Sequence, residues 1–448
     1  MRILKPLVVA LAAALSVPVM AASNTLVGWA MMPADTFSDG PTSGQMVSGN
    51  PYGTFTPPYE GRQPVQGFSA ILPGADENSF IVMTDNGFGA QGNSADTLLR
   101  LYSVRPDFRT ASGGSGKVSA SDYHSGTPLA RFIGPSRLSL NDINQTLGLP
   151  IQADYRFYYN DGSKPAVDGD IRFGRLLTGA DLDVESVRRD RSCAMWFGDE
   201  FGPYLIKTDA SGTVLRSAIS LPGVYAPQHA DVLAGRATAN LGSSGGFEGM
   251  AINPRGDRLY TLLEKTVDGD PDGSLRISEF DIDQERYTGR VVFYRLQAPN
   301  HAIGDMTALD DSRFLVIERN GDTATRGEPF KRIYLIDTRQ VANGGVVHKT
   351  ELVDLMRLDD PDDLNRDGQR QFTFPYVTIE SVLPLDSRTL LVTNDNNFPG
   401  GGGRELAADV TEFLKIRLAQ PISGVRPPHL QQAKDARRCQ TVVGANQR

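Results

Sequence analysis

Short apolar runs recur along the chain, and turn-forming residues separate them. Residues 80–83, 258–263 and 389–392 are examples, and Gly, Asp, Asn or Pro flank each of them. Few segments carry the 3.6-residue apolar period of an amphipathic helix. Many short strands with frequent turns are typical of a sandwich, a barrel or a propeller. The pattern therefore predicts an all-β protein.

A hairpin plan repeats five times, beginning near residues 68, 185, 248, 305 and 380. In four repeats, two acids lie at equal distances from a turn sequence. Residues equidistant from the turn of an antiparallel hairpin are cross-strand neighbours, so we expect both acids at its open end. The first repeat has Phe68-Ser69 in place of the first acid and keeps only Asp85. The acidic pairs are Glu185 with Glu200, Glu248 with Glu264, Asp305 with Glu318, and Glu380 with Asp395.

Radial repetition of this kind predicts a closed β-propeller, because a ring protects sheet edges. The first interval between repeats is about twice as long as the others, so we expect six blades, within a range of five to seven. The additional blade would lie between residues 129 and 175. Strands over 25–32 and 411–418 would close the ring. An open β-sandwich pair remains the alternative.

The N-terminal segment carries a signal of export, and the two cysteines fit an oxidising compartment. A basic start, an apolar stretch from Leu7 to Val19 and small residues at its end predict a signal peptide over 1–21. An uncleaved anchor is the alternative, and no later segment is apolar enough to span a membrane. We therefore expect a propeller domain over 22–420 in the periplasm or outside the cell. A tail over 421–448 follows, and a Cys193–Cys439 disulfide would tie it down, with two free thiols as the alternative.

Net charge narrows the choice of partner. The formal charge is −8, and removing Arg2 and Lys5 with the signal peptide gives about −10. An acidic chain disfavours a nucleic-acid partner. The oligomeric state does not follow from the sequence.

Convergence of the repeats would gather many carboxylates in one place. Close like charges raise one another's pKa unless a cation, a proton or a basic side chain offsets them. Hard oxygen ligands favour Ca²⁺, with Mg²⁺ as the alternative. A water-filled central channel, whose acids bind backbone amides and arginines, explains the pattern equally well. The expected members are Asp85, Glu185, Asp199, Glu200, Glu248, Glu264, Asp305, Glu318, Glu380 and Asp395.

A second candidate cation site is the loop over 268–279. Its acids Asp268, Asp270 and Asp272, with Gly273 and Glu279, fit the twelve-position calcium-loop pattern. Strands rather than helices flank this loop. A polar hairpin loop without a metal is therefore the alternative.

The repeat motifs also carry a family resemblance. The motifs are Thr84-Asp85-Asn86-Gly87-Phe88-Gly89, Asp181-Leu182-Asp183-Val184-Glu185-Ser186, Gly198-Asp199-Glu200-Phe201-Gly202-Pro203-Tyr204, Gly246-Phe247-Glu248-Gly249-Met250-Ala251 and Asn394-Asp395-Asn396-Asn397-Phe398-Pro399. Together they resemble the "esterase-like activity of phytase" family, from about residue 66 to residue 418. The resemblance implies an extracytoplasmic propeller-like domain and a calcium-dependent phosphoester hydrolase that acts on a small phosphorylated or ester substrate.

Roles follow from this hypothesis. We assign catalysis to Glu185, Glu248, Glu264, Glu380 and His301, and substrate binding to Arg175, Lys265 and Arg319. We assign metal binding to Asp85, Asp199, Glu200, Asp305, Glu318 and Asp395, and to the loop acids Asp268, Asp270 and Asp272. The alternative function is a non-catalytic propeller that binds a ligand or protein in the cell envelope. The absence of a nucleophile motif favours that alternative.

Overall fold

The computed structural model describes residues 23–47, 56–404, 409–424 and 439. The predicted signal peptide over 1–21 and most of the tail over 421–448 lie outside these ranges. Within them the regular secondary structure is mainly β-strand, with four short 3-10 turns and two short α-helices, α1 (Gly169–Gly174) and α2 (Ala230–Leu233). None of the helices described is long and apolar enough to cross a membrane.

Five units of four antiparallel strands, here called blades 1 to 5, make up the described structure. Blade 1 comprises β4 (Phe68–Pro73), β5 (Phe80–Thr84), β6 (Arg100–Asp107) and β7 (Lys117–Ala120). Blade 2 comprises β9 (Val184–Arg189), β10 (Met195–Asp199), β11 (Tyr204–Thr208) and β12 (Ile219–Ser220). Blade 3 comprises β13 (Phe247–Ile252), β14 (Arg258–Leu263), β15 (Ser274–Asp281) and β16 (Arg286–Arg295).

The last two blades complete the ring. Blade 4 comprises β17 (His301–Ala308), β18 (Arg313–Asn320), β19 (Lys331–Asp337) and β20 (His348–Asp354). Blade 5 comprises β23 (Ile379–Pro384), β24 (Thr389–Asn394) and β25 (Thr411–Arg417), and the N-terminal β1 (Thr25–Met32) is its outer strand. The prediction that strands near the two ends of the chain pair with each other is confirmed.

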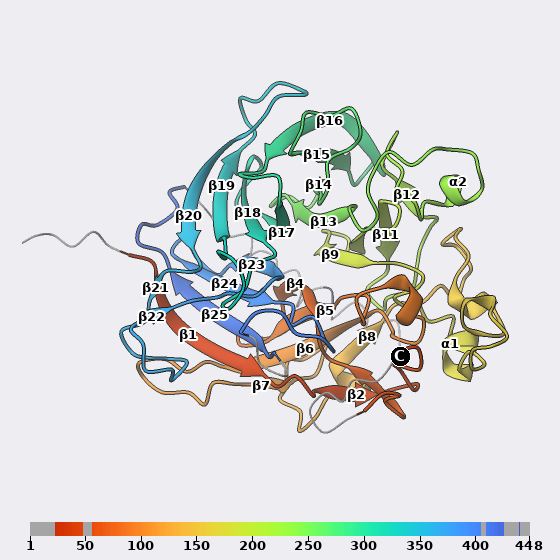
Figure 1. Ribbon diagram of the computed structural model, residues 1–448, viewed down its shortest axis with the longest axis horizontal. Helices are drawn as coiled ribbons and strands as arrows, with labels where there is room; N and C mark the ends of the chain where they lie inside the picture. Colours follow the sequence, from red (N-terminus) through yellow and green to blue (C-terminus); the bar gives the residue numbers. More distant parts are fainter. Residues whose placement is uncertain (1–22, 48–55, 405–408, 425–438, 440–448) are drawn as a thin grey trace, which may run out of the picture.

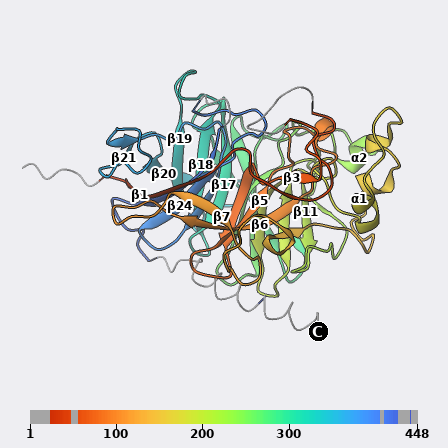
Figure 2. The same ribbon diagram turned by 90° about the horizontal axis from the view of Figure 1, so that it is seen from below.

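The innermost strands of the five blades surround the centre of the molecule (Figure 1). Each of them contacts the next around the ring, in the order β4, β9, β13, β17, β23 and back to β4. A parallel bridge from β1 to β7 joins blades 5 and 1 on the outside. Figure 2 shows the same blades after a 90° turn, with β1 at the left near β20 and β24. The arrangement is a closed, propeller-like ring.

The predicted sixth blade is not present among the described residues. The segment over 121–183 contributes β8 (Arg137–Ser139), which pairs with β6, and α1, but mostly turns. Its apolar side chains, including Leu140, Tyr158 and Ile171, pack into the same core as blades 1 and 2. The long first interval is therefore an insertion that covers the core. Smaller additions are β2 (Phe37–Asp39) with β3 (Arg62–Pro64), and β21 (Leu358–Asp359) with β22 (Gln371–Phe372).

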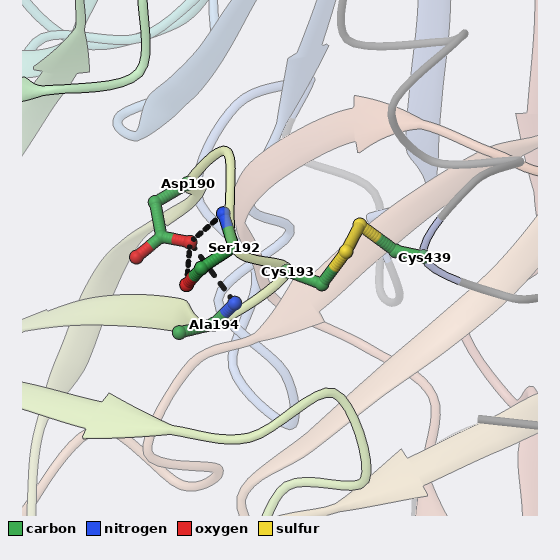
Figure 3. The surroundings of a disulfide bond; sticks show 5 residues. All are labelled: Asp190, Ser192, Cys193, Ala194 and Cys439. Carbon is green, nitrogen blue, oxygen red and sulfur yellow. Dashed lines mark hydrogen bonds between the residues drawn. A yellow bond between two sulfur atoms is a disulfide. The ribbon is translucent and has the colours of Figure 1, made fainter. Parts of the chain in front are cut away.

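The predicted disulfide joins Cys193 to Cys439, with Cα atoms 5.3 Å apart (Figure 3). Cys193 follows the first hairpin turn of blade 2, where Asp190 accepts hydrogen bonds from the Ser192 hydroxyl and from two backbone amides. The bond links residues 246 apart in sequence. It therefore anchors the C-terminal region to blade 2.

Breaking this link should lower stability. Closing so long a loop restricts the unfolded chain, and the chain-entropy model assigns about 5 kcal/mol to it. We expect Cys193→Ser, Cys439→Ser and the double variant to lower the free energy of unfolding by similar amounts in urea titrations. Variants as stable as the parent would show that the link contributes nothing.

Candidate functional site

A β-bulge recurs at the start of each innermost strand. In blade 3 the register passes from Phe247 opposite Leu263 to Gly249 opposite Leu262, which leaves Glu248 as the extra residue. The other four hairpins shift in the same place. A bulge re-aims the side chain it carries. The five extra residues, here called the bulge ring, are Ser69, Glu185, Glu248, Gly304 and Glu380.

A second set of equivalent residues lies one position past the strand pair that precedes each bulge; four of them follow the end of the second strand, and Arg319 lies within β18. In blades 1, 2 and 3 the backbone amide of this residue donates to the carbonyl of the residue just before the first strand pair, as in Glu264 to Gly246 at 2.9 Å. The register places one residue per blade here. This strand-end ring consists of Asp85, Glu200, Glu264, Arg319 and Asp395.

The predicted pairing of acids is confirmed in blades 2, 3 and 5, and it is wrong in blade 4. There Gly304 is the bulge residue, and Arg319 holds the position that Glu264 holds in blade 3. A Cβ on Gly304 would lie 1.9 Å from the Ile379 carbonyl oxygen, so blades 4 and 5 can approach this closely only at a glycine. Each acid of blade 4 therefore lies one residue away from the ring position expected of it.

Asp305 and Glu318 instead form separate structural contacts. Asp305 accepts from Arg188 at 3.0 Å and from the backbone of Val382, which joins blades 2, 4 and 5. Glu318 is fully buried, where it bonds Tyr294, Lys349 and His301. His301 and Glu318 thus belong to the contact between blades 3 and 4. Asp305, Glu318 and His301 therefore lie outside the central cluster, a name used here for the acids of the bulge ring and the strand-end ring together with Asp183 and Arg319.

Three carboxylates between blades 1 and 2 form the tightest acidic group. Oxygens of Asp85, Asp183 and Glu185 all lie within 4.8 Å of one another, and no other described group of His, Cys, Asp and Glu meets this limit. Asn86 donates from its side-chain amide to Asp183 at 2.8 Å. Here the group is called the Asp85 triad. Its donor set is the one that a hard divalent cation prefers.

Arg319 neutralises the opposite side of the cluster. Its Nη2 lies 3.3 Å from Glu248, 3.6 Å from Glu264 and 3.4 Å from Glu380. One guanidinium therefore serves three glutamates from blades 3 and 5. Ser69 supplies a further weak contact, 3.3 Å from Glu380.

Burial and mutual repulsion raise the pKa of most acids in the cluster. Burial is the main cause for Asp85 and Asp183, whose pKa values rise to about 6, and for Asp395, which rises to about 7. The pKa values of Glu185, Glu200, Glu248 and Glu380 are raised well above the usual value, by burial first and then by neighbouring carboxylates. The basic side chains of the cluster are therefore too few to neutralise all of its carboxylates.

Glu200 gives independent evidence that a partner belongs in the cluster. Its side chain is 5% exposed, and its Oε1 has no hydrogen-bond partner within the described structure. Lys265 lowers its pKa only as a minor contribution against that of Glu264, which raises it. Lys265 itself donates to the Ser243 carbonyl and lies 4.0 Å from Glu264. A buried carboxylate without a partner is costly, so the residues present fit a bound cation.

A pocket of about 320 Å³ opens onto this cluster. Asp85 and Asp395 lie in its wall, together with Phe88 and Phe398. Asp85 is also the partly exposed member of the Asp85 triad. A small molecule in this pocket would therefore reach a cation held by that triad.

Other predicted residues lie elsewhere. Asp199 is fully buried, and it accepts backbone amides of Asp183 and Gly202, so it shapes the turn that presents Asp183. Arg175 ends α1 at the edge of the molecule, where it bonds Asp142 and Asp154. The structure does not bring Arg175 to the cluster (Figure 1).

The calcium-like loop over 268–279 forms a hairpin connection between β14 and β15. Both carboxylate oxygens of Asp270 bind Arg276, at 2.6 and 2.8 Å. Glu279, the twelfth residue, lies within β15 and pairs with Tyr260. Asp268, Asp270 and Asp272 do not form a metal-capable group with one another or with other acids among the described residues.

Asp183 was not among the residues predicted from sequence, yet it completes the Asp85 triad. It occupies the backbone position that Gly67 and Gly246 hold in blades 1 and 3. The alternation Asp181, Asp183, Glu185 was the available signal, because alternate residues of a strand share a face.

Comparisons with solved structures return low scores. An exo-β-1,3-galactanase from Phanerochaete chrysosporium gives a TM-score of 0.37 at 12% identity, covering 84% of this chain and 63% of its own. An α-L-arabinofuranosidase from Podospora anserina gives 0.35 at 10% identity, covering 88% and 98%. A β-propeller domain from Myceliophteria thermophila gives 0.25 at 13% identity, covering 48% and 49%. At these scores the likeness carries no argument about activity.

Sequence comparisons are more informative. An uncharacterized secreted protein of Arthroderma benhamiae is 28% identical over 124 residues, which is 22% of this chain. The chain spans about a quarter of the length of that relative, 24%. The model of the family described as Phytase-like, esterase-like activity of phytase, matches residues 63–398. This range includes the bulge ring and the strand-end ring of all five blades, and the chain therefore belongs to the Phytase-like family.

Proposed function

We propose that the protein is an extracytoplasmic phosphoester hydrolase that depends on a divalent cation, Ca²⁺ with Mg²⁺ as the alternative. The observation that carries the proposal is the Asp85 triad at the inner end of a pocket of about 320 Å³. Family membership supports phytase-like chemistry. The disulfide and the secreted relative support a place outside the cytoplasm.

Asp85, Asp183 and Glu185 would hold the cation. When bound, such an ion would polarise a phosphoryl oxygen and activate water. Hydrolysis would pass the oxygen of one water to phosphorus as the ester P–O bond breaks, with one water proton kept on the new P–OH group and the other passed to the leaving alcohol. Asp395 faces the same pocket, and its pKa of about 7 suits a group that accepts and returns that proton near neutral pH.

Arg319 would act on the acids rather than on the substrate. It already pairs with Glu248, Glu264 and Glu380. This pairing keeps part of the cluster neutral without a metal. It also favours the second candidate function, a propeller that binds a ligand without catalysis, because Arg–Glu pairs filling the centre are a structural solution in themselves.

Hydrolysis of phosphate esters tests the proposal. We expect turnover of phenyl phosphate that a chelator removes and Ca²⁺ restores. Asp183→Asn should lower kcat/KM at least about a hundredfold, because one metal ligand is lost. Asp270→Asn is the matched control, since Asp270 binds Arg276 in the calcium-like loop, and it should keep the parent activity. No chelator-sensitive turnover of any ester would favour the non-catalytic alternative.

A further inference from the structure

Two copies of one turn motif build the pocket above the Asp85 triad. Asp85-Asn86-Gly87-Phe88 follows the second strand of blade 1, and Asp395-Asn396-Asn397-Phe398 follows the second strand of blade 5. In both, the Asp belongs to the strand-end ring, and the Phe three residues later lines the pocket. The two adjacent blades thus contribute the same pair of features, a carboxylate and a phenyl ring.

The two phenyl rings are held in place. Their centroids lie 6.1 Å apart, and Tyr59 packs against both, at 6.1 Å from Phe88 and 5.7 Å from Phe398. Phe37 packs against Tyr59 at 4.9 Å and against Phe398 at 5.9 Å. Phe88 and Phe398 are almost fully buried in this cluster, so only a small part of each ring lines the pocket. The rings therefore give the pocket one fixed apolar wall, against which an apolar group of a ligand can pack.

The charges of the pocket are all of one sign. Its described lining contains Asp85 and Asp395 but no Lys, Arg or His, and the rest is Gly, Val, Pro, Asn and Phe. Arg319, the guanidinium of the cluster, is already shared among three glutamates. Among the described lining residues a ligand phosphate meets no basic side chain, so a bound cation would neutralise the first phosphate and further phosphates would face Asp85 and Asp395.

We propose that this pocket selects monoesters that carry one phosphate and one compact apolar group, preferably aromatic, and rejects polyphosphorylated alcohols. The inference rests on the proposed function and names its substrate class. Size agrees with it, because about 320 Å³ is near the lower limit for small-molecule sites. Phe88 and Phe398 are then the residues that determine specificity.

Competition between two substrates tests the selectivity. With Ca²⁺ present, kcat/KM for phenyl phosphate should exceed that for inositol hexakisphosphate at least about a hundredfold. Phenylphosphonate should bind at least about tenfold more tightly than methylphosphonate in calorimetric titrations. Equal or greater turnover of inositol hexakisphosphate would overturn the inference and leave the proposed function intact. Tight phenylphosphonate binding without turnover of any ester would support the ligand class and refute the hydrolase.

Substitutions of Phe88 and Phe398 test whether these two rings determine the preference for an aromatic ester. Phe88→Leu and Phe398→Leu should each raise KM for phenyl phosphate about threefold to tenfold, with kcat unchanged. Phe132→Leu is the matched control, because Phe132 is a similarly buried ring that packs against Tyr102 and does not line this pocket. It should keep the parent KM. Folding of each variant is checked by its thermal midpoint, and phenylphosphonate affinity is compared among folded variants. An equal change in all three variants would overturn the assignment.

Discussion

The metal-free protein should lose stability as the pH rises from about 4 to about 7, and Ca²⁺ should reverse the loss. The folded-state pKa values of Asp85 and Asp183 are about 6 and that of Asp395 is about 7, against an ordinary value of 3.8. Below pH 3.8, the three acids are protonated in both the folded and the unfolded protein, so the folded protein contains no buried carboxylate charge from them. As the pH rises, the unfolded state ionises first, so the free energy of unfolding falls until the folded-state pKa values are passed.

The size of the effect follows from the size of the shifts. One pKa unit corresponds to about 1.4 kcal/mol, so several raised acids should together cost about 3 kcal/mol or more between pH 4.5 and pH 7.5. A cation that binds only the folded state raises the free energy of unfolding by about 2.7 kcal/mol when its concentration is a hundred times its Kd. The gain should be largest at high pH, where the acids are ionised.

Urea titrations with chelator and with Ca²⁺ across this range measure both effects. Asp183→Asn removes one of the titrating groups and should flatten the metal-free curve. A stability that rises from pH 4.5 to pH 7.5 in chelator would contradict the assignment of raised pKa values to the cluster.

Replacing Arg319 should produce the other large effect. Arg319→Met leaves Glu248, Glu264 and Glu380 without their shared cation in a buried site. Removing one partner of a buried ion pair costs about 3–5 kcal/mol, because the remaining charge is uncompensated. We expect that loss at pH 7.5 and a smaller one at pH 5, because burial and neighbouring carboxylates raise the pKa values of Glu248 and Glu380.

The controls for Arg319 separate charge from packing. Arg339→Met removes an exposed arginine paired with Asp337, and it should leave the thermal midpoint unchanged. Adding Glu264→Gln to Arg319→Met removes one of the stranded charges and should restore part of the lost stability. If Arg319→Met behaved like Arg339→Met, the guanidinium would not be needed to hold the acids together.

Spacing in the sequence predicted the hairpins and their shared acidic end, but it could not predict the bulges. In blades 2, 3 and 5 the bulge residue is the expected glutamate, so the prediction holds. In blade 4 the bulge falls on Gly304, where the close approach to Ile379 excludes a side chain. Asp305 and Glu318 are therefore displaced by one residue and bind other partners. A shift of one residue turns a strand side chain to the other face.

The number of blades could not be predicted from the sequence for a different reason. The interval before blade 2 is long enough for four strands, but α1 and its neighbouring turns fill it. Their apolar side chains, such as Tyr158 and Ile171, bury themselves against blades 1 and 2 without pairing as strands. Periodicity in short apolar runs does not distinguish the two outcomes. The Cys193–Cys439 link, by contrast, followed from the presence of two cysteines in a chain predicted to be exported.

Metal content tests the central claim most directly. The mature protein, its Asp183→Asn variant and its Asp270→Asn variant would be dialysed against Ca²⁺ and analysed by elemental mass spectrometry, with calorimetric titration of the stripped proteins. The account predicts tightly bound Ca²⁺ in the parent and in Asp270→Asn, and its loss in Asp183→Asn. Ca²⁺ retained by Asp183→Asn, or no Ca²⁺ bound by the parent, would contradict a cation site at the Asp85 triad.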